Sequence, residues 1–354
     1  MGNITFESEP GYPESVPPQA TPRAEGDIGS GERLIAGLKG GVHRSLAWAR
    51  RNEIREFWDW ARCKRVILPT VAQLAESLGA LQGSAMAPAN VEEDIEEPIF
   101  LLANGWRAGS TLLQRILVTD PSVLLWGEPL GEMAILSGIA STLTRISGFP
   151  RLQETFAKEN LSSSTMATSW IASLYPPGND LRMALRSFFD QWLRGPARQR
   201  GFARWGFKEV RLGATEASLL HWLYPKAKFV ILSRHPYDCY RSLADSRWHH
   251  VYYRRPDVRV DTAAPFARHW NRLAVSWSEL PAGFPAFYLK YEDLISGRVD
   301  LRKLESWLGI EVAEKVALSV FVGQTAVRKR LSWYEQLIIG HEAGEGMGAL
   351  GYSG

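Results

Sequence analysis

Three short apolar runs along the chain predict buried strands. The first is bounded by proline on one side and by Asn104-Gly105 on the other, which is typical of a strand covered on both faces. Apolar residues at helical spacing follow each run. The predicted strands are 98–103, 228–233 and 286–290, and the helices behind them are 111–118, 237–246 and one that begins at 301–308.

Alternation of strands with helices predicts the fold class. A strand, a glycine-containing turn and a helix open a βαβ unit, and repeated units give a mostly parallel sheet with helices on both faces. The segment 131–199 is expected to be mostly helical, with a break at 176–179, and a further helix is expected over 71–81. The sequence therefore predicts an α/β protein with a central sheet.

The amino-terminal quarter of the chain differs from the rest. Residues 1–30 are rich in proline and small polar residues and predict a disordered leader. Residues 33–65 carry nine basic and three acidic side chains among regularly spaced aromatic residues, which favours amphipathic helices with a solvated basic face. Contact with an anionic partner or membrane surface is the alternative for this segment. We expect 31–95 to form a helical extension that ends in an acidic linker, and 96–354 to form the main domain.

Composition excludes several classes of protein. With 354 residues, 45% hydrophobic and 22% charged, the chain is neither collagen-like nor wholly disordered. A net charge of +3 is too small to indicate nucleic-acid binding by bulk charge. Cys63 and Cys239 allow one disulfide at most, which excludes a disulfide scaffold and a thiolate zinc site. The sequence has neither a signal-peptide pattern nor an apolar span, so we expect a soluble cytoplasmic protein.

The turn after the first predicted strand has the parts of an anion-binding loop. Gly105 and Gly109 allow a sharp bend and a close approach of backbone amides to a ligand. Ser110 and Thr111 stand at the expected helix start, where the dipole favours an anion, and Arg107 adds a fixed positive charge. An ordinary strand-to-helix connection is the alternative interpretation of these residues.

A second anion-binding position is expected after the second strand. Arg234 ends that strand and Ser242 follows on the next helix, at the carboxyl edge of the sheet where ligands bind in open α/β folds. A nucleoside-triphosphate loop would carry lysine after its second glycine, whereas Gly109 is followed directly by Ser110. The missing lysine weakens a kinase or ATPase interpretation.

Taken together, these segments resemble the sulfotransferases that use 3′-phosphoadenosine-5′-phosphosulfate (PAPS). The matching segments, in order, are Arg107-Ala-Gly-Ser-Thr111, Arg234-His-Pro-Tyr-Asp-Cys-Tyr-Arg-Ser242, Leu289-Lys-Tyr-Glu-Asp-Leu294 and Leu350-Gly-Tyr352. The resemblance covers about 98–354 and implies a three-layer, P-loop-like fold. It also implies PAPS as the sulfuryl donor, no metal, and a hydroxyl-bearing acceptor.

The resemblance assigns roles to individual residues. The donor's 5′-phosphosulfate is expected on the first loop, and its 3′-phosphate on Arg234 and Ser242. Lys208, in a segment similar to the family's W-G-x-K-x-P with Val210 in place of proline, is expected to stabilise the transferring sulfuryl group together with Arg107. The expected donor-binding residues are Arg107, Ala108, Gly109, Ser110, Thr111, Leu112, Arg234, Ser242, Tyr291, Arg328 and Lys329.

Glu128 is the expected general base. It follows a glycine downstream of the loop helix, where tyrosylprotein-type members carry a catalytic glutamate. A base of this kind works best when burial raises its pKa. Other family members use a histidine two residues after the lysine, a position that Val210 occupies here. Glu209, His249 and His250 are the weaker candidates for the base, and a capping or salt-bridged role is the alternative for Glu128.

The sequence thus predicts a PAPS-dependent sulfotransferase. The acceptor hydroxyl could belong to a peptide tyrosine, a carbohydrate, a lipid or a small metabolite, because acceptor pockets lie in variable loops. The alternatives are a kinase that uses ATP and magnesium, and a nucleotide-binding protein of the same fold without turnover. Arg328 and Lys329 could equally be a solvated basic run, and Tyr291 could equally be a core residue.

Overall fold

The computed structural model describes residues 70–83, 96–129, 134–145, 162–168, 178–246, 260, 262–312 and 330–353. Several predictions lie outside these residues: the leader 1–30, the basic helices of 33–65, His249, His250, Arg328 and Lys329. The proposed domain boundary at residue 96 stays a prediction.

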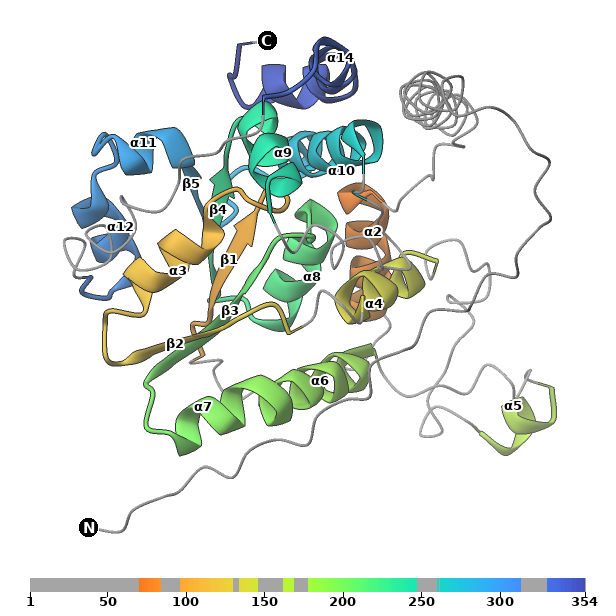
Figure 1. The fold of residues 1–354 in the computed structure, drawn as a ribbon. Coiled ribbons are helices and arrows are strands. Elements are labelled where there is room, and N and C mark those ends of the chain that lie inside the picture. Colours follow the sequence, from red (N-terminus) through yellow and green to blue (C-terminus); the bar gives the residue numbers. More distant parts are fainter. Residues whose placement is uncertain are drawn as a thin grey trace, which may run out of the picture. The chain divides into compact units, whose positions relative to one another are not determined.

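The core of the fold is a five-stranded sheet with the order β2-β3-β1-β4-β5 (Figure 1). All of its strand pairs are parallel, as the alternation of elements predicts. Their carboxyl ends therefore share one edge of the sheet, and β1 lies at the centre. The strands are β1 (Ile99–Ala103), β2 (Val123–Trp126), β3 (Arg204–Glu209), β4 (Lys228–Ser233) and β5 (Ala286–Lys290).

Helices cover both faces of this sheet. The side chains of β1 are all buried and alternate between the two hydrophobic cores, because successive residues of a strand point to opposite faces. One face is covered by α3 (Ser110–Leu117), α9 (Pro236–Ala244), α10 (Ala263–Ser276), α12 (Leu301–Leu308) and α14 (Trp333–Ala349). The other is covered by α2 (Val71–Gly83), α4 (Ile135–Leu143), α6 (Gly178–Phe189) and α8 (Ala214–Leu223). The expected three-layer α/β architecture is confirmed.

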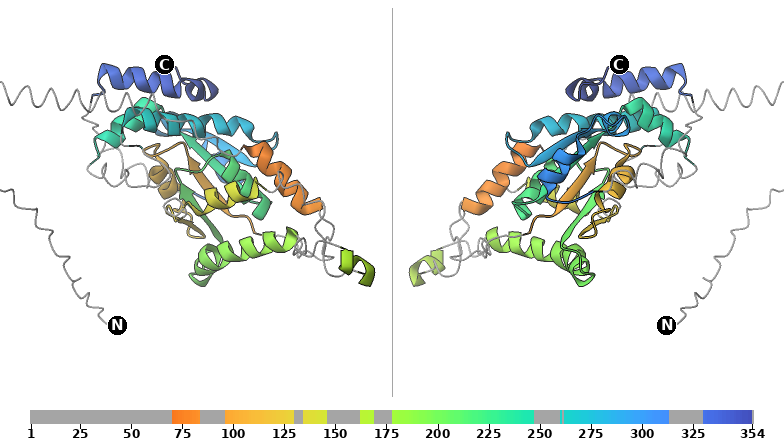
Figure 2. Two further views of the ribbon diagram at one scale, coloured as in Figure 1. Left: turned by 90° about the vertical axis from the view of Figure 1, so that its right-hand side faces the viewer. Right: turned by 90° about the vertical axis from the view of Figure 1, so that its left-hand side faces the viewer.

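Aromatic rings fill the core on the α2, α4, α6 and α8 face. Phe100 of β1 lies at their centre, with its ring centroid 4.7 Å from that of Phe207 and 5.3 Å from that of Phe229. Trp205 and Tyr224 contact Phe100 edge-on. On the opposite face α14 lies along α10, as both views of Figure 2 show.

A buried carboxylate fixes the chain just before β1. Glu96 accepts hydrogen bonds from Arg194 at 3.2 Å, from Arg198 at 3.0 Å and from the indole nitrogen of Trp205 at 3.2 Å. Burial alone would raise the pKa of Glu96, but Arg198 and Arg194 together hold it below its ordinary value. The arginines belong to a π-helical turn, η4 (Asp190–Arg194), and to α7 (Gly195–Gln199).

The structure also corrects and extends the sequence analysis. β2 and β3 are strands that the hydrophobic pattern did not predict, whereas the other three strands agree with it. The middle of the chain is helical in its described parts, which include the short α5 (Ser163–Thr168). Two further short elements are η6 (Trp277–Glu279) and α11 (Tyr291–Ile295). Within the described residues, no helix combines the length and apolar character needed to cross a membrane.

Candidate active site

The turn between β1 and α3 forms a tight loop at the carboxyl edge of the sheet. Gly105, Arg107 and Gly109 all have positive φ, at 89°, 64° and 90°. Gly109 caps α3. The first backbone amides of this helix have no intrahelical acceptor, as is true at the start of any α-helix. The ring of Tyr291 lies directly over Gly109, since a Cβ atom at this position would be 2.2 Å from the ring. The loop thus keeps its bend and its exposed amides only with glycine here.

Two arginines and a serine meet on this loop. The side chain of Arg107 donates from Nε to the hydroxyl of Ser242 on α9, at 3.0 Å. Arg234, which follows β4, donates to the backbone oxygen of Arg107 at 3.0 Å, and its guanidinium lies 4.4 Å from the ring centroid of Tyr291. The Nε of Arg234 is buried and has no hydrogen-bond partner among the described residues. We call Arg107, Gly109, Arg234, Ser242 and Tyr291 the anion cluster.

The carboxyl-terminal segment packs against the residues that flank the anion cluster. The hydroxyl of Tyr352 lies 3.0 Å from the hydroxyl of Ser233 and donates to Glu292 at 3.2 Å. Glu292 also accepts the backbone amide of His235 at 2.9 Å. Burial raises the pKa of the Tyr352 hydroxyl, so this group stays protonated and can donate. The three later segments of the sulfotransferase resemblance therefore pack against one another around Arg234.

A second polar cluster lies at the ends of β2 and β3. Lys208 donates to Oε1 of Glu128. One side-chain nitrogen of Arg211 donates to Oε1 of Glu209 at 2.7 Å and forms an ion pair with Oε2 of Glu128 at 2.9 Å. The side chains of Lys208 and Arg211 are 7% exposed, and that of Glu128 is 27% exposed. We call these four residues the base cluster.

Burial acts on Glu209 rather than on Glu128. Glu209 is fully buried, and desolvation raises its pKa although Arg211 opposes the shift. The Oε2 of Glu209 has no hydrogen-bond partner among the described residues. The buried environment that we expected for Glu128 is therefore found at its neighbour in the cluster, and Glu128 itself faces partly outward.

Trp106 of the β1–α3 loop connects the two clusters. The guanidinium of Arg211 lies 5.1 Å from the centroid of the Trp106 ring, a cation–π distance. On its other side, Trp106 contacts His269 of α10 at a centroid distance of 5.0 Å. The loop that carries Arg107 and Gly109 therefore also supports the base cluster through its own tryptophan.

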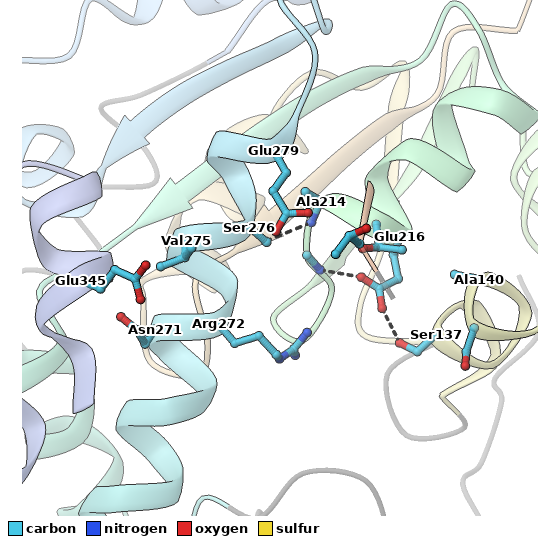
Figure 3. A pocket seen from close by; sticks show the side chains of 14 residues that line it. Ser137, Ala140, Ala214, Glu216, Asn271, Arg272, Val275, Ser276, Glu279 and Glu345 are labelled. Carbon is cyan, nitrogen blue, oxygen red and sulfur yellow. Dashed lines mark hydrogen bonds between the residues drawn. The ribbon is translucent and has the colours of Figure 1, made fainter. Parts of the chain in front are cut away.

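A cavity of about 270 Å³ begins where the chain leaves the base cluster and enters α8 (Figure 3). Its walls include α4, the start of α8, and α10, and most of the residues that line it have polar side chains. Arg272 lines the cavity and also donates to the backbone oxygen of Arg211 at 3.3 Å. Glu216 also lines the cavity, where it accepts a hydrogen bond from Ser137 of α4 at 2.7 Å (Figure 3).

Most of the residues expected to form the site come together, but in two groups. Among the described residues, Arg107 bonds to Ser242 and makes no recorded contact with Lys208 or Glu128. Ala108 and Leu112 are buried, so their side chains belong to the core and only their backbone is available to a ligand. Arg328 and Lys329 lie outside the described residues, and the absence of a metal stays a prediction.

Sequence reasoning did not find Arg211, Trp106 and Arg272. The signal for Arg211 is its position three residues after Lys208, just beyond the carboxyl end of a strand. That signal depends on knowing that 204–209 is a strand. Glu209 was only a weaker candidate for the base.

A family model described as "Sulfotransferase family" matches residues 98–314, well over half of the chain. The chain belongs to the sulfotransferase family. The matched region begins just before β1 and includes every residue of both clusters, but it ends before the carboxyl-terminal segment around Tyr352. No curated protein matches the chain.

Solved sulfotransferase structures are also similar to this family member. A sulfotransferase from Alicyclobacillus acidocaldarius is 15% identical with a TM-score of 0.40, over 72% of this chain and 95% of that chain. The sulfotransferase domain from the curacin biosynthetic pathway is 17% identical with a TM-score of 0.41, over 74% and 99%. Mouse sulfotransferase SULT7A1, solved in complex with PAP, is 14% identical with a TM-score of 0.36, over 77% and 88%.

Proposed function

We propose that this family member transfers the sulfuryl group of PAPS to a hydroxyl acceptor. The observation that carries the proposal is that a loop suited to anion binding and a lysine–glutamate pair lie at the same edge of the sheet. The loop follows β1, the lysine ends β3 and the glutamate follows β2. Sulfuryl transfer needs an anion site, a cation near the reacting group and a base for the acceptor's proton.

The residues of the anion cluster fit the donor. The amides at the start of α3 and the side chain of Arg107 would hold the 5′-phosphosulfate, because a helix start with an added arginine favours an anion. Arg234 and Ser242 would hold the 3′-phosphate, and the unpartnered Nε of Arg234 supports this assignment. The Tyr291 ring would flank the donor beside Arg234. When bound, PAPS supplies an activated sulfuryl group and leaves as 3′,5′-adenosine bisphosphate.

The base cluster would carry out the proton transfer. Glu128 accepts the proton of the acceptor hydroxyl as the new oxygen–sulfur bond forms. Lys208 stabilises the negative charge that develops as the bond to the bridging oxygen breaks. Lys208 and Glu128 are hydrogen-bonded to each other. A short movement of the Lys208 ammonium therefore frees Glu128 to act as the base and lets Lys208 reach the sulfuryl group. The acceptor class stays open between a peptide tyrosine, a carbohydrate and a small metabolite.

Thermal stabilisation by 3′,5′-adenosine bisphosphate tests the donor site. A ligand at a hundred times its Kd adds about 2.7 kcal/mol to stability, so the bisphosphate should raise the melting temperature clearly. Arg234→Ala should abolish this shift, while Arg298→Ala, a surface arginine paired with Asp293, should keep it. A rise in melting temperature with ATP and magnesium but not with the bisphosphate would instead favour the kinase alternative.

Replacement of the base tests the chemistry. Glu128→Gln should lower sulfuryl transfer by about 100-fold or more, because general base catalysis contributes about 10²- to 10⁴-fold. Its affinity for 3′,5′-adenosine bisphosphate should stay close to that of the wild type, since Glu128 contacts no residue of the anion cluster among the described contacts. Near-normal turnover in this variant would exclude Glu128 as the base.

A further inference from the structure

One guanidinium in the base cluster is shared between two carboxylates. The same nitrogen of Arg211 lies 2.9 Å from Glu128 and 2.7 Å from Glu209. We propose that Arg211 is a positioning residue that holds the Glu128 carboxylate in place while Lys208 shifts from Glu128 to the sulfuryl group of the donor. This inference rests on the proposed function and adds a residue to which neither the sequence motifs nor the family match assigns a role.

Lys208 has two tasks that it cannot perform at the same time. In the structure its ammonium bonds to Oε1 of Glu128, whereas the proposed reaction needs it at the sulfuryl group. The flexible four-carbon stem of lysine permits this movement. When Lys208 leaves, Oε1 becomes free to accept the proton of the acceptor, and Oε2 of Glu128 keeps its ion pair with Arg211.

Arg211 is held more firmly than Lys208. The fully buried Glu209 binds the Arg211 side chain, and Oε1 of Glu209 is itself fixed by the backbone amide of Val210 at 2.8 Å. The guanidinium lies over the Trp106 ring, and the backbone oxygen of Arg211 accepts a hydrogen bond from Arg272. These restraints come from β3, the β1–α3 loop and α10, so movement of Lys208 does not release Arg211.

Two carboxylates, Glu128 and Glu209, share the charge of Arg211. Lys208 also pairs with Glu128, while Arg272 of α10 contacts the backbone oxygen of Arg211 and the ring of His269. Desolvation raises the pKa of Glu209, and the charge and hydrogen bond of Arg211 oppose this shift, so the two groups stabilise each other in the buried site. The alternative is that Arg211 only neutralises the buried Glu209 and has no part in turnover.

Single-turnover kinetics distinguish a role of Arg211 in positioning Glu128 from a role only in neutralising Glu209. Release of sulfate from ³⁵S-labelled PAPS is measured with water as the acceptor, at varied enzyme concentration. Arg211→Met should lower the maximal rate by about 100-fold, because a misplacement of about 1 Å at a reacting group costs about that much. The half-saturating concentration should change less than about threefold, since Arg211 is not in the anion cluster.

Two further variants complete the kinetic test. Arg211→Lys keeps the charge but loses the planar guanidinium that lies over the Trp106 ring, so it should recover part of the rate. Arg268→Met, which breaks an arginine–glutamate pair of 2.8 Å between α10 and α14, should leave the rate unchanged. A wild-type maximal rate in Arg211→Met, or a change confined to half-saturation, would overturn the proposal.

A stability measurement tests the same contact without turnover. The loss of melting temperature caused by Arg211→Met is compared in two backgrounds, Lys208→Met with Glu128 and Lys208→Met with Glu128→Gln. The loss should be about 2–4 °C larger in the background that keeps Glu128, because residues in contact show a coupling energy of this order. Equal losses would show that Arg211 does not hold Glu128 and would overturn the proposal. If Arg211→Met does not fold, Arg211→Lys takes its place in this cycle.

The outcomes also distinguish the positioning role from the proposed function. If the wild type releases no sulfate and 3′,5′-adenosine bisphosphate does not stabilise it, the proposed function fails. The melting-temperature cycle still reports whether Arg211 holds Glu128 in that case. A wild type that is active and stabilised, with no coupling between Arg211 and Glu128, refutes the positioning role alone.

Discussion

Gly109 shows how one residue can decide whether the anion cluster forms. It combines a left-handed backbone conformation with a Tyr291 ring that occupies the space a Cβ atom would need, so a side chain is excluded for two independent reasons. The ring in turn carries the cation–π contact of Arg234. A change at Gly109 therefore moves the tyrosine and the arginine together.

A comparison of two glycine variants tests this coupling. Gly109→Ala should weaken binding of 3′,5′-adenosine bisphosphate by about tenfold or more, because the new methyl group displaces Tyr291, and a 1.4 kcal/mol loss already equals tenfold. Gly201→Ala is the matched control, since Gly201 has φ of 87° with open space around its Cα. Calorimetric titration measures both affinities, and equal affinities in the two variants would contradict the role of the ring.

At the level of elements, the pairing of β1 with β3 depends on Gly206. A Cβ atom here would lie 1.8 Å from the backbone oxygen of Ile99, its register partner in β1. Both strands are buried, so neither backbone can shift to make room. The glycine of the segment Trp205-Gly-Phe-Lys208 thus serves the sheet, and through it the placement of Lys208.

Gly206→Ala should destabilise the protein by about 3 kcal/mol, the upper end of the range for overpacked cores. Gly138→Ala is the control on α4, where no atom lies within 4 Å of the added methyl group. It should be neutral or stabilise by about 0.5–1 kcal/mol, because alanine restricts the unfolded chain. Chemical denaturation measures both, and similar stabilities for the two variants would contradict the close approach of the strands.

The sequence pattern revealed the purely structural strands more readily than the strand that carries chemistry. β1 and most of β4 are apolar runs, whereas β3 begins with Arg204 and ends with Lys208 and Glu209. These polar residues interrupt the apolar pattern because they belong to the site and not to the core. Arg211 was missed for the same reason, since its position has meaning only once β3 is recognised as a strand.

For the whole molecule, titration of buried carboxyls determines the dependence of stability on pH. Glu96 has a lowered pKa in the folded state, so it stabilises the fold above its ordinary value of 4.5, and this contribution is lost as the pH falls through the folded value. Glu209 has a raised pKa, so its contribution is present at low pH and is lost as the pH rises through the raised value.

Glu96→Gln tests the acid side of this dependence. At pH 7 the variant should be less stable by about 1–2 kcal/mol, a value that allows for the partial exposure of Arg194 and Arg198. The difference from wild type should shrink as the pH falls below 4.5. Glu97→Gln is the control, because Glu97 only approaches Arg204 and Lys228 at 3.9 Å and 4.0 Å. Melting temperatures across this pH range measure the effect, and a constant difference would contradict it.

The strand order places Lys208 and Arg234 on opposite sides of β1. β3 and β4 are both neighbours of β1, so the two residues follow strands that are two steps apart in the sheet. Each step is about 4.8 Å, so the backbone hydrogen bonds of the sheet set an interval of about 10 Å between the two strand ends. If the proposed donor site is right, this interval would separate the reacting end of the donor from its 3′-phosphate, and a small sulfate ester without a distant phosphate would occupy one end of the interval but not both.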